Sequence, residues 1–135
     1  MKVPTGHFRD ELMLRIILAT VRPDAFRSFA EAMSKDQEVS LDLASSGAET
    51  VGIVRTHTPH LVIIDFELPD TESLSLVKEL LAVNAFVNTA VVSSLSEQEF
   101  HDASEGLGVL ARLPVNPGES EATELLEKLR GVMGR

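Results

Sequence analysis

The sequence predicts an α/β domain, in which a parallel β-sheet carries helices on both faces. Apolar runs of strand length alternate along the chain with segments that repeat apolar residues at helical spacing. The alternation continues through five strand–helix units, with short connections and neither a repeat nor an internal linker. Such alternation is typical of parallel sheets. A length of 135 residues and a hydrophobic fraction of 44% suit one domain with a sizeable core.

The first two units lead from a buried strand to an edge strand. Residues 14–19, LRIILA, form a near-continuous apolar run, which is typical of a strand covered on both faces. A helix is expected over residues 22–36, because Pro23 suits a first turn and apolar residues follow at helical spacing. Residues 39–45 alternate apolar and polar side chains and predict an edge strand, and a short helix over residues 47–57 follows it.

The remaining units contain the most apolar strand of the chain. This strand covers residues 60–65, HLVIID, and its composition predicts a central place in the sheet. The helix over residues 72–83 carries leucine and valine at helical spacing. The later elements are strands over residues 89–94 and 109–113 and helices over residues 96–106 and 119–133.

Composition excludes several classes of function. The formal net charge is −9, from 12 basic and 21 acidic residues, which argues against binding nucleic acid through a general basic field. The chain has no cysteine, so disulfides, cysteine-ligated zinc and thiol catalysis are excluded. Residues 1–12 form a polar leader with a tendency to disorder and without the apolar stretch of a signal peptide. The apolar run over residues 12–21 is too short to span a bilayer, so a cytoplasmic protein with no membrane partner is expected.

Polar side chains end three of the predicted strands. Thr20 follows the first strand, Asp65 ends the third and Ser93 lies near the end of the fourth. In open α/β sheets, sites form at the carboxyl ends of the strands near the topological switch point. We therefore expect these three side chains to converge.

The segment PHLVIIDFELPD, residues 59–70, resembles the phosphoacceptor strand of response-regulator receiver domains, usually written P-D-L-V-L-L-D-x-x-L-P-D. Three further segments match the family. RIILATVRP resembles the motif KILIVDDEP, and GLGVLARLP resembles the motif GADGYLxKP. AVVSS resembles the strand that ends in Thr or Ser before a small residue. The similarity covers residues 13–134. It implies a receiver-like domain with the flavodoxin-like doubly wound (βα)5 fold, a three-layer sandwich whose five parallel strands run in the order 2-1-3-4-5.

The resemblance implies a role for each matching position. Asp65 falls at the phosphoacceptor, Ser93 at the switch hydroxyl, and Pro114 at a proline preceded by a cis bond from Leu113. In receivers, two acids after the first strand hold Mg²⁺ together with the acceptor Asp, and a Lys neutralises the phosphoryl group. An aromatic side chain on the fifth strand swings to follow the switch hydroxyl when that hydroxyl bonds the phosphoryl group. The positions of the acids fall on Thr20 and Val21, that of the Lys on Leu113, and that of the aromatic on Leu110. The chain therefore looks like a degenerate receiver, and no bound metal or other cofactor is expected.

Nearby side chains are candidates to replace the lost groups. Glu67 is a possible substitute acid, although a solvated loop acid is the commoner role for such a residue. Thr20 and Ser93 are candidates to hydrogen-bond Asp65 in place of the ion. Arg22 and Arg112 lie near the same strand ends and could supply positive charge, but alternation along the strand directs Arg112 to the opposite side.

The leading functional hypothesis is a bacterial receiver-like signalling domain of a two-component phosphorelay, and not an enzyme. It would be phosphate-independent or weakly phosphorylated and would act by protein contact. Its partner would be a sensor histidine kinase or another protein. In the family, the fourth helix, fifth strand and fifth helix commonly form the dimer or partner face, which makes a homodimer through this face possible here.

Two alternatives from the residues stay open and one is disfavoured. The chain could be a conventional receiver phosphorylated at Asp65. It could also be a small phosphohydrolase-like enzyme that uses Asp65, because Asp65-Phe66-Glu67 resembles the D-x-D motif of haloacid-dehalogenase-type enzymes. A nucleotide-binding domain is disfavoured, because no glycine follows the first strand to admit a pyrophosphate.

Overall fold

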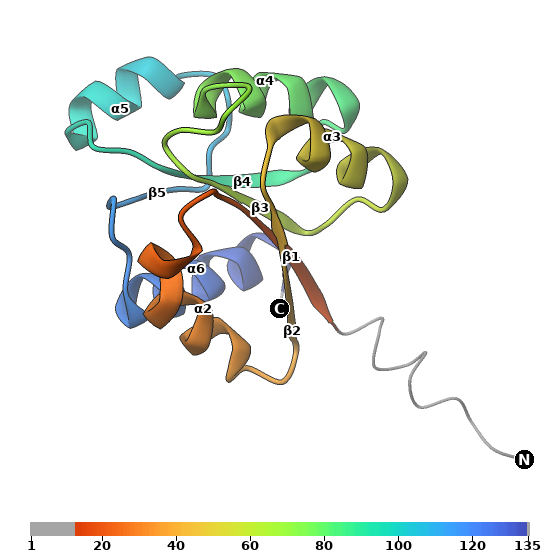
Figure 1. Ribbon diagram of the computed structural model, residues 1–135, viewed down its shortest axis with the longest axis vertical. Helices are drawn as coiled ribbons and strands as arrows, with labels where there is room; N and C mark the ends of the chain where they lie inside the picture. The colour runs from red at the N-terminus through yellow and green to blue at the C-terminus, as the bar shows by residue number, and fades with distance from the viewer. Residues whose placement is uncertain (1–12, 135) are drawn as a thin grey trace, which may run out of the picture.

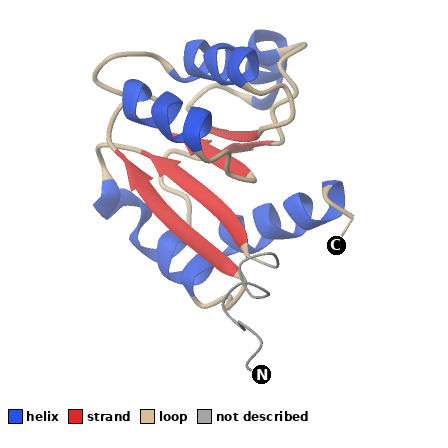
Figure 2. Cartoon of the chain, turned by 90° about the vertical axis from the view of Figure 1, so that its right-hand side faces the viewer, coloured by secondary structure: helices blue, strands red, loops and turns tan. Residues whose placement is uncertain are grey.

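The computed structural model describes residues 13–134, so the predicted leader over residues 1–12 lies outside the described residues. A five-stranded parallel sheet runs in the order β2-β1-β3-β4-β5 between two layers of helices (Figures 1 and 2). This order confirms the flavodoxin-like fold expected from the sequence. The strands are β1 (Leu14–Ala19), β2 (Val39–Ala44), β3 (Leu61–Ile64), β4 (Asn88–Val92) and β5 (Ala111–Leu113).

The helices divide between the two faces of the sheet. α2 and α6 cover one face, and α3, α4 and α5 lie on the other (Figure 1). The central strand β3 is buried along its whole length, as its apolar run predicted, while β2 lies at one edge. The helical elements are the 3-10 turn η1 (Pro23–Phe26), α2 (Arg27–Ser34), α3 (Gly47–Thr56), α4 (Ser73–Val83), α5 (Glu97–Ser104) and α6 (Glu119–Val132).

Two elements begin at least two residues later than the sequence predicts. The helix expected over residues 22–36 begins as the separate 3-10 turn η1, whose last residue, Phe26, is fully buried and meets Phe29 edge to face. The fifth strand begins at Ala111 and not at residue 109, because the loop before it contains two glycines with positive φ, Gly106 at 84° and Gly108 at 62°. Both differences arise from local backbone geometry that apolar spacing does not encode.

A carboxylate joins the loop after β3 to the start of α3. Asp70 accepts hydrogen bonds from the backbone N–H groups of Gly47 at 2.8 Å and Ala48 at 2.9 Å. These bonds lower the pKa of Asp70, that from Gly47 most strongly, and the charge suits the positive end of the helix. The contact fixes the loop that leads away from the end of β3, where the candidate site lies.

Gly47→Ala is expected to destabilise the protein by about 1–3 kcal/mol, as overpacking does. A Cβ atom at Gly47 would lie 2.5 Å from Cγ2 of Thr71 and 3.3 Å from Oδ1 of Asp70. Chemical denaturation measures the effect, and Thr71→Ser, which removes Cγ2, should recover most of it in the double variant. Equal losses with and without Thr71→Ser would contradict this packing. Gly52→Ala, which meets no atom within 4 Å, is the matched control.

Candidate functional site

The carboxyl ends of β1, β3 and β4 bring together the polar residues that the sequence singled out. Thr20 is 4% exposed, Asp65 is fully buried and Ser93 is 9% exposed. The backbone N–H of Asp65 donates to the carbonyl of Ala19 at 2.9 Å, which sets the end of β3 beside the end of β1. Asp65 therefore lies at the topological switch point of the sheet, where α/β proteins build their sites.

The carboxylate of Asp65 accepts four hydrogen bonds. Its Oδ2 atom accepts from Thr20 Oγ1 at 2.6 Å and from Arg22 Nε at 2.9 Å. Its Oδ1 atom accepts from Arg22 Nη2 at 2.7 Å and from the backbone N–H of Phe66 at 2.8 Å. A buried charge is costly unless it is paired and hydrogen-bonded, and the two-pronged contact with Arg22 meets both needs.

Arg22 is held from several sides. Besides its two bonds to Asp65, Nη2 donates to the carbonyl of Val115 at 3.0 Å. Its guanidinium carbon lies 4.6 Å from the centroid of the Phe66 ring and 5.7 Å from that of Phe26. The hydrogen bond with Asp65 raises the pKa of Arg22 above its ordinary value, so the group stays charged. One cation thereby joins the loops after β1, β3 and β5.

Thr20 connects the two charged groups. Its Oγ1 accepts a hydrogen bond from the backbone N–H of Arg22 at 2.8 Å while it donates to Asp65. We call Thr20, Arg22, Asp65 and Phe66 the Asp65 cluster. Sequence reasoning named Thr20 as a hydrogen-bond partner and Arg22 as a source of charge. It gave no indication that Arg22 would bind both oxygens.

Ser93 and Arg112 lie near the cluster without contacting Asp65 through any described hydrogen bond. The Oγ atom of Ser93 accepts from the backbone N–H of Leu95 at 3.1 Å, in the loop after β4. Arg112 turns toward α5, where Nη1 donates to the carbonyl of Ser93 at 3.4 Å and Nη2 lies 3.9 Å from Glu97. Of the two predicted hydroxyl partners, only Thr20 makes the bond to Asp65.

The positions that the resemblance matches to the receiver acids, Lys and aromatic residue lie in different environments. Val21 is 53% exposed, whereas Leu113 is 3% exposed and packs into the core beneath α6, with the partly buried Leu110 against the same cluster. Glu67 is exposed, and its backbone forms an isolated bridge with Glu72. Among residues 13–134, no three His, Cys, Asp or Glu side chains come together in a way that could hold a metal ion.

The cis bond expected before Pro114 is absent. Every peptide bond over the described residues is trans, that between Leu113 and Pro114 included, so this prediction was wrong. Trans is the favoured isomer of an X–Pro bond by about 0.5–1 kcal/mol. In this chain the residue before the proline is the buried Leu113, at the position that the resemblance matches to a lysine. After Pro114, the carbonyl of Val115 points to Arg22 and accepts its hydrogen bond.

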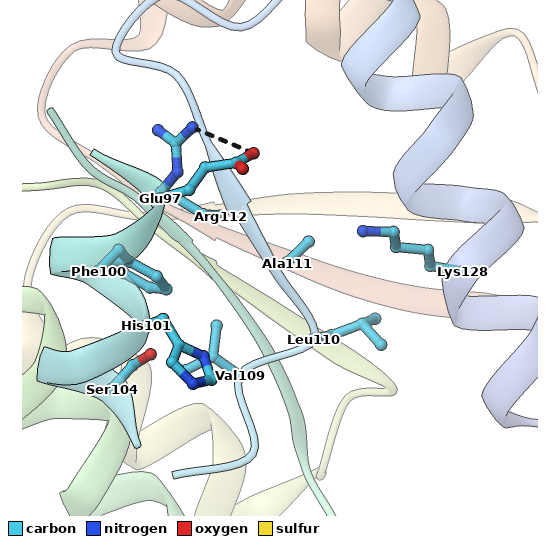
Figure 3. A pocket seen from close by; sticks show the side chains of 9 residues that line it. All are labelled: Glu97, Phe100, His101, Ser104, Val109, Leu110, Ala111, Arg112 and Lys128. Atoms are coloured by element: carbon cyan, nitrogen blue, oxygen red, sulfur yellow. Dashed lines mark ion pairs between the residues drawn. The ribbon is translucent and has the colours of Figure 1, made fainter. Parts of the chain in front are cut away.

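Away from the Asp65 cluster, a hollow lies beside β5, between α5 and α6 (Figure 3). It measures about 300 Å³, and Arg112 and Lys128 bring positive charge to it, with the ion pair between Arg112 and Glu97 at one side and His101 beside it. This is the face that the family resemblance assigns to partners. The remaining lining residues are Phe100, Ser104, Val109, Leu110 and Ala111.

Comparisons with known proteins agree on the fold. No family model matches the chain. The response regulator domain of Thermotoga maritima CheB is 20% identical, with 91% of this chain and 98% of that one covered and a TM-score of 0.71. A two-component response regulator from Legionella pneumophila is 18% identical, with 87% and 98% covered and a TM-score of 0.72. The fold that the resemblance implied is thus confirmed, because this chain has the fold of these response regulators.

One curated protein matches part of the sequence. It is a protein-glutamate methylesterase/protein-glutamine glutaminase from Methanospirillum hungatei, which is 29% identical over 69 residues. The match covers 50% of this chain and 20% of that enzyme. The chain therefore spans about a fifth of the length of this relative. In the described part of the chain, no helix is both long and apolar enough to cross a membrane.

Proposed function

We propose that this chain is a cytoplasmic receiver-like signalling domain of a two-component system that acts through phosphate-independent protein contact. The receiver fold supports the signalling assignment. The Asp65 cluster supports phosphate independence, because Arg22 binds both oxygens of the residue at the phosphoacceptor position. This bidentate ion pair is the single observation that carries the proposal.

Phosphorylation would need a free carboxylate oxygen and positive groups placed to neutralise the phosphoryl oxygens. Both oxygens of Asp65 already accept two hydrogen bonds each. The guanidinium that neutralises Asp65 also shields it from an incoming phosphoryl donor, because it is held in place by the Phe66 ring stacked on it and by the bond from Nη2 to the carbonyl of Val115. Transfer to Asp65 would first have to break this pair.

The residues at the site do not fit Mg²⁺. This ion binds oxygen ligands in octahedral geometry, usually with one or two carboxylates. Thr20 and Val21 supply none after β1, and the carboxylate of Asp65 faces a cation. Glu67 is exposed on the next loop and has no described hydrogen bond to the cluster. Neither Mg²⁺ nor another cofactor is therefore part of the proposed function.

The proposal includes no enzymatic activity. A phosphohydrolase of the type considered would need a lysine and further acids close to Asp65, and the group that contacts both Asp65 oxygens is the guanidinium of Arg22. The methylesterase relative is matched over a fifth of its length only. The partner would be a sensor histidine kinase or another protein, and a homodimer would use the face around β5 that Figure 3 shows.

A small-molecule phosphodonor tests the proposal. Incubation with acetyl phosphate and Mg²⁺, followed by intact mass measurement, is expected to leave the chain without a phosphoryl adduct. A response regulator that accepts a phosphoryl group from acetyl phosphate under the same conditions serves as the control for the donor. Adduct formation at a comparable rate, abolished by Asp65→Asn, would overturn phosphate independence. Amide NMR spectra with beryllofluoride and Mg²⁺ should likewise show no shifts around Asp65 and Ser93.

A further inference from the structure

Exposed apolar side chains concentrate around Val21, beside the Asp65 cluster. Val21 is 53% exposed, Leu43 58% and Phe66 38%. Single apolar residues at a surface are ordinary, whereas a contiguous group marks an interaction site. Over the described residues, the other large apolar side chains that are exposed are Phe86, Leu95 and Val132.

Two hollows meet at Val21 and make the group continuous. One, of about 480 Å³, lies against β2 and is lined by Val21, Pro23, Leu43 and Ala44 among others. The other, of about 330 Å³, lies against the loop after β3 and is lined by Val21, Phe66, Leu68 and Pro69 among others. Val21 forms the ridge between them. We call Val21, Pro23, Leu43, Phe66 and Pro69 the Val21 surface.

The Asp65 cluster holds this surface in shape. Val21 lies between Thr20 and Arg22, and both of these neighbours bond to Asp65. The ring of Phe66 stacks against the guanidinium of Arg22, and its backbone N–H donates to Asp65. A preformed surface loses little conformational entropy when a partner binds. The ion pair between Arg22 and Asp65 therefore also keeps the Val21 surface in one shape, in addition to neutralising Asp65.

Carboxylates surround the surface. Glu49 lines the hollow against β2, and Glu67 lines the hollow against the β3 loop. Asp24 follows Pro23, but its carboxylate is already paired with Arg27 at 3.1 Å. The single cation that lines either hollow is Arg22, whose charge is already paired with Asp65. This acidic rim disfavours nucleic acid and anionic membranes, and it favours lysine or arginine on a partner.

We propose that the Val21 surface docks a protein segment that presents two apolar side chains, one for each hollow, flanked by lysine or arginine. The apolar side chains would fill the hollows on either side of Val21, and the basic residues would face Glu49 and Glu67. The inference rests on the proposed function, since it assigns the contact surface of the signalling domain.

Synthetic helices test the chemistry of the partner. The probe is an amphipathic peptide of leucine and lysine, titrated into the ¹⁵N-labelled chain at physiological ionic strength. Amide shifts are expected to centre on Val21, Leu43 and Phe66. Two comparison peptides separate the contributions, one with alanine in place of leucine and one with glutamate in place of lysine. Both are expected to bind at least about tenfold more weakly than the leucine–lysine peptide, because the first lacks the apolar side chains and the second lacks the positive charge.

Matched variants locate the contact. Leu43→Ser is expected to weaken binding of the leucine–lysine peptide by about tenfold, the value of one buried leucine. Val132→Ser should leave it unchanged, because Val132 is 59% exposed and Leu43 58%, at separate places on the molecule. Glu67→Lys should also weaken binding by reversing a rim charge.

Each adverse outcome is distinct. Equal binding of the alanine–lysine peptide would mean attraction by charge alone and would overturn the proposal. Shifts centred on the hollow between α5 and α6, or loss with Val132→Ser and not Leu43→Ser, would overturn the assignment of the surface. Phosphorylation of Asp65 by acetyl phosphate would instead overturn phosphate independence and leave the peptide result standing, because the peptide titration is made on the unphosphorylated chain without a phosphodonor.

Discussion

Arg22→Ala is expected to lower the free energy of unfolding by about 3 kcal/mol, at the lower end of the range for breaking a buried ion pair. The variant leaves Asp65 fully buried with its charge unpaired, while Thr20 and the Phe66 N–H remain as partners. The value lies at the lower end because the Arg22 side chain is 29% exposed, so water can reach part of the vacated space. Urea denaturation at neutral pH, followed by circular dichroism, measures the loss.

The chain offers a matched control for this change. Arg27 pairs with Asp24 at 3.1 Å, but the two side chains are 70% and 91% exposed. Arg27→Ala should therefore cost no more than about 1 kcal/mol. Arg22→Lys should recover only part of the loss, because an ammonium cannot make the two parallel bonds to the carboxylate. A loss for Arg22→Ala no larger than that for Arg27→Ala would contradict the structural role of the pair.

The fold could be predicted from the sequence because apolar residues recur with the spacing of strands and helices. The run over residues 14–19 matches β1, and the apolar HLVIID segment identified the central strand β3. Apolar spacing also indicated the helices over residues 22–36, 72–83 and 119–133, although α2 begins later than expected. The strand order came from the resemblance, since alternation alone does not decide which parallel strands are neighbours. The structural neighbours have the same fold.

The hydrogen-bond partners of Asp65 could be predicted from the sequence only in part. Parallel strands end at one edge of the sheet, which was enough to bring Thr20 and Asp65 together. The bidentate bond from Arg22 depends on how the loop after β1 turns, and therefore on the 3-10 turn at Pro23 that the spacing did not predict. The carbonyl of Val115 carries no side-chain signal at all. Contacts made by the backbone between distant loops leave no pattern in one sequence.

Restoring acids after β1 is expected to create a Mg²⁺ site only when Arg22 is also replaced. The double variant Thr20→Asp/Val21→Asp supplies the two carboxylates, but the guanidinium still binds both oxygens of Asp65. At about 4 Å and an effective dielectric of about 20, the guanidinium charge opposes the divalent ion by about 8 kcal/mol, twice the value for two unit charges. The triple variant with Arg22→Ser removes that repulsion and should bind Mg²⁺ at least about tenfold more tightly.

Titration of Mg²⁺ into both variants, followed by amide NMR at Phe66 and Ser93, measures the difference. Leu113 is left unchanged, because it is 3% exposed in the core and a lysine there would unfold the packing beneath α6. Equal affinity in the two variants would contradict the exclusion of the ion by Arg22 and would leave the missing carboxylates at positions 20 and 21 as the determinant of Mg²⁺ binding. The expected difference would instead make Arg22 the resident counterion of Asp65, so that acids could return to this loop with effect only after the arginine had gone.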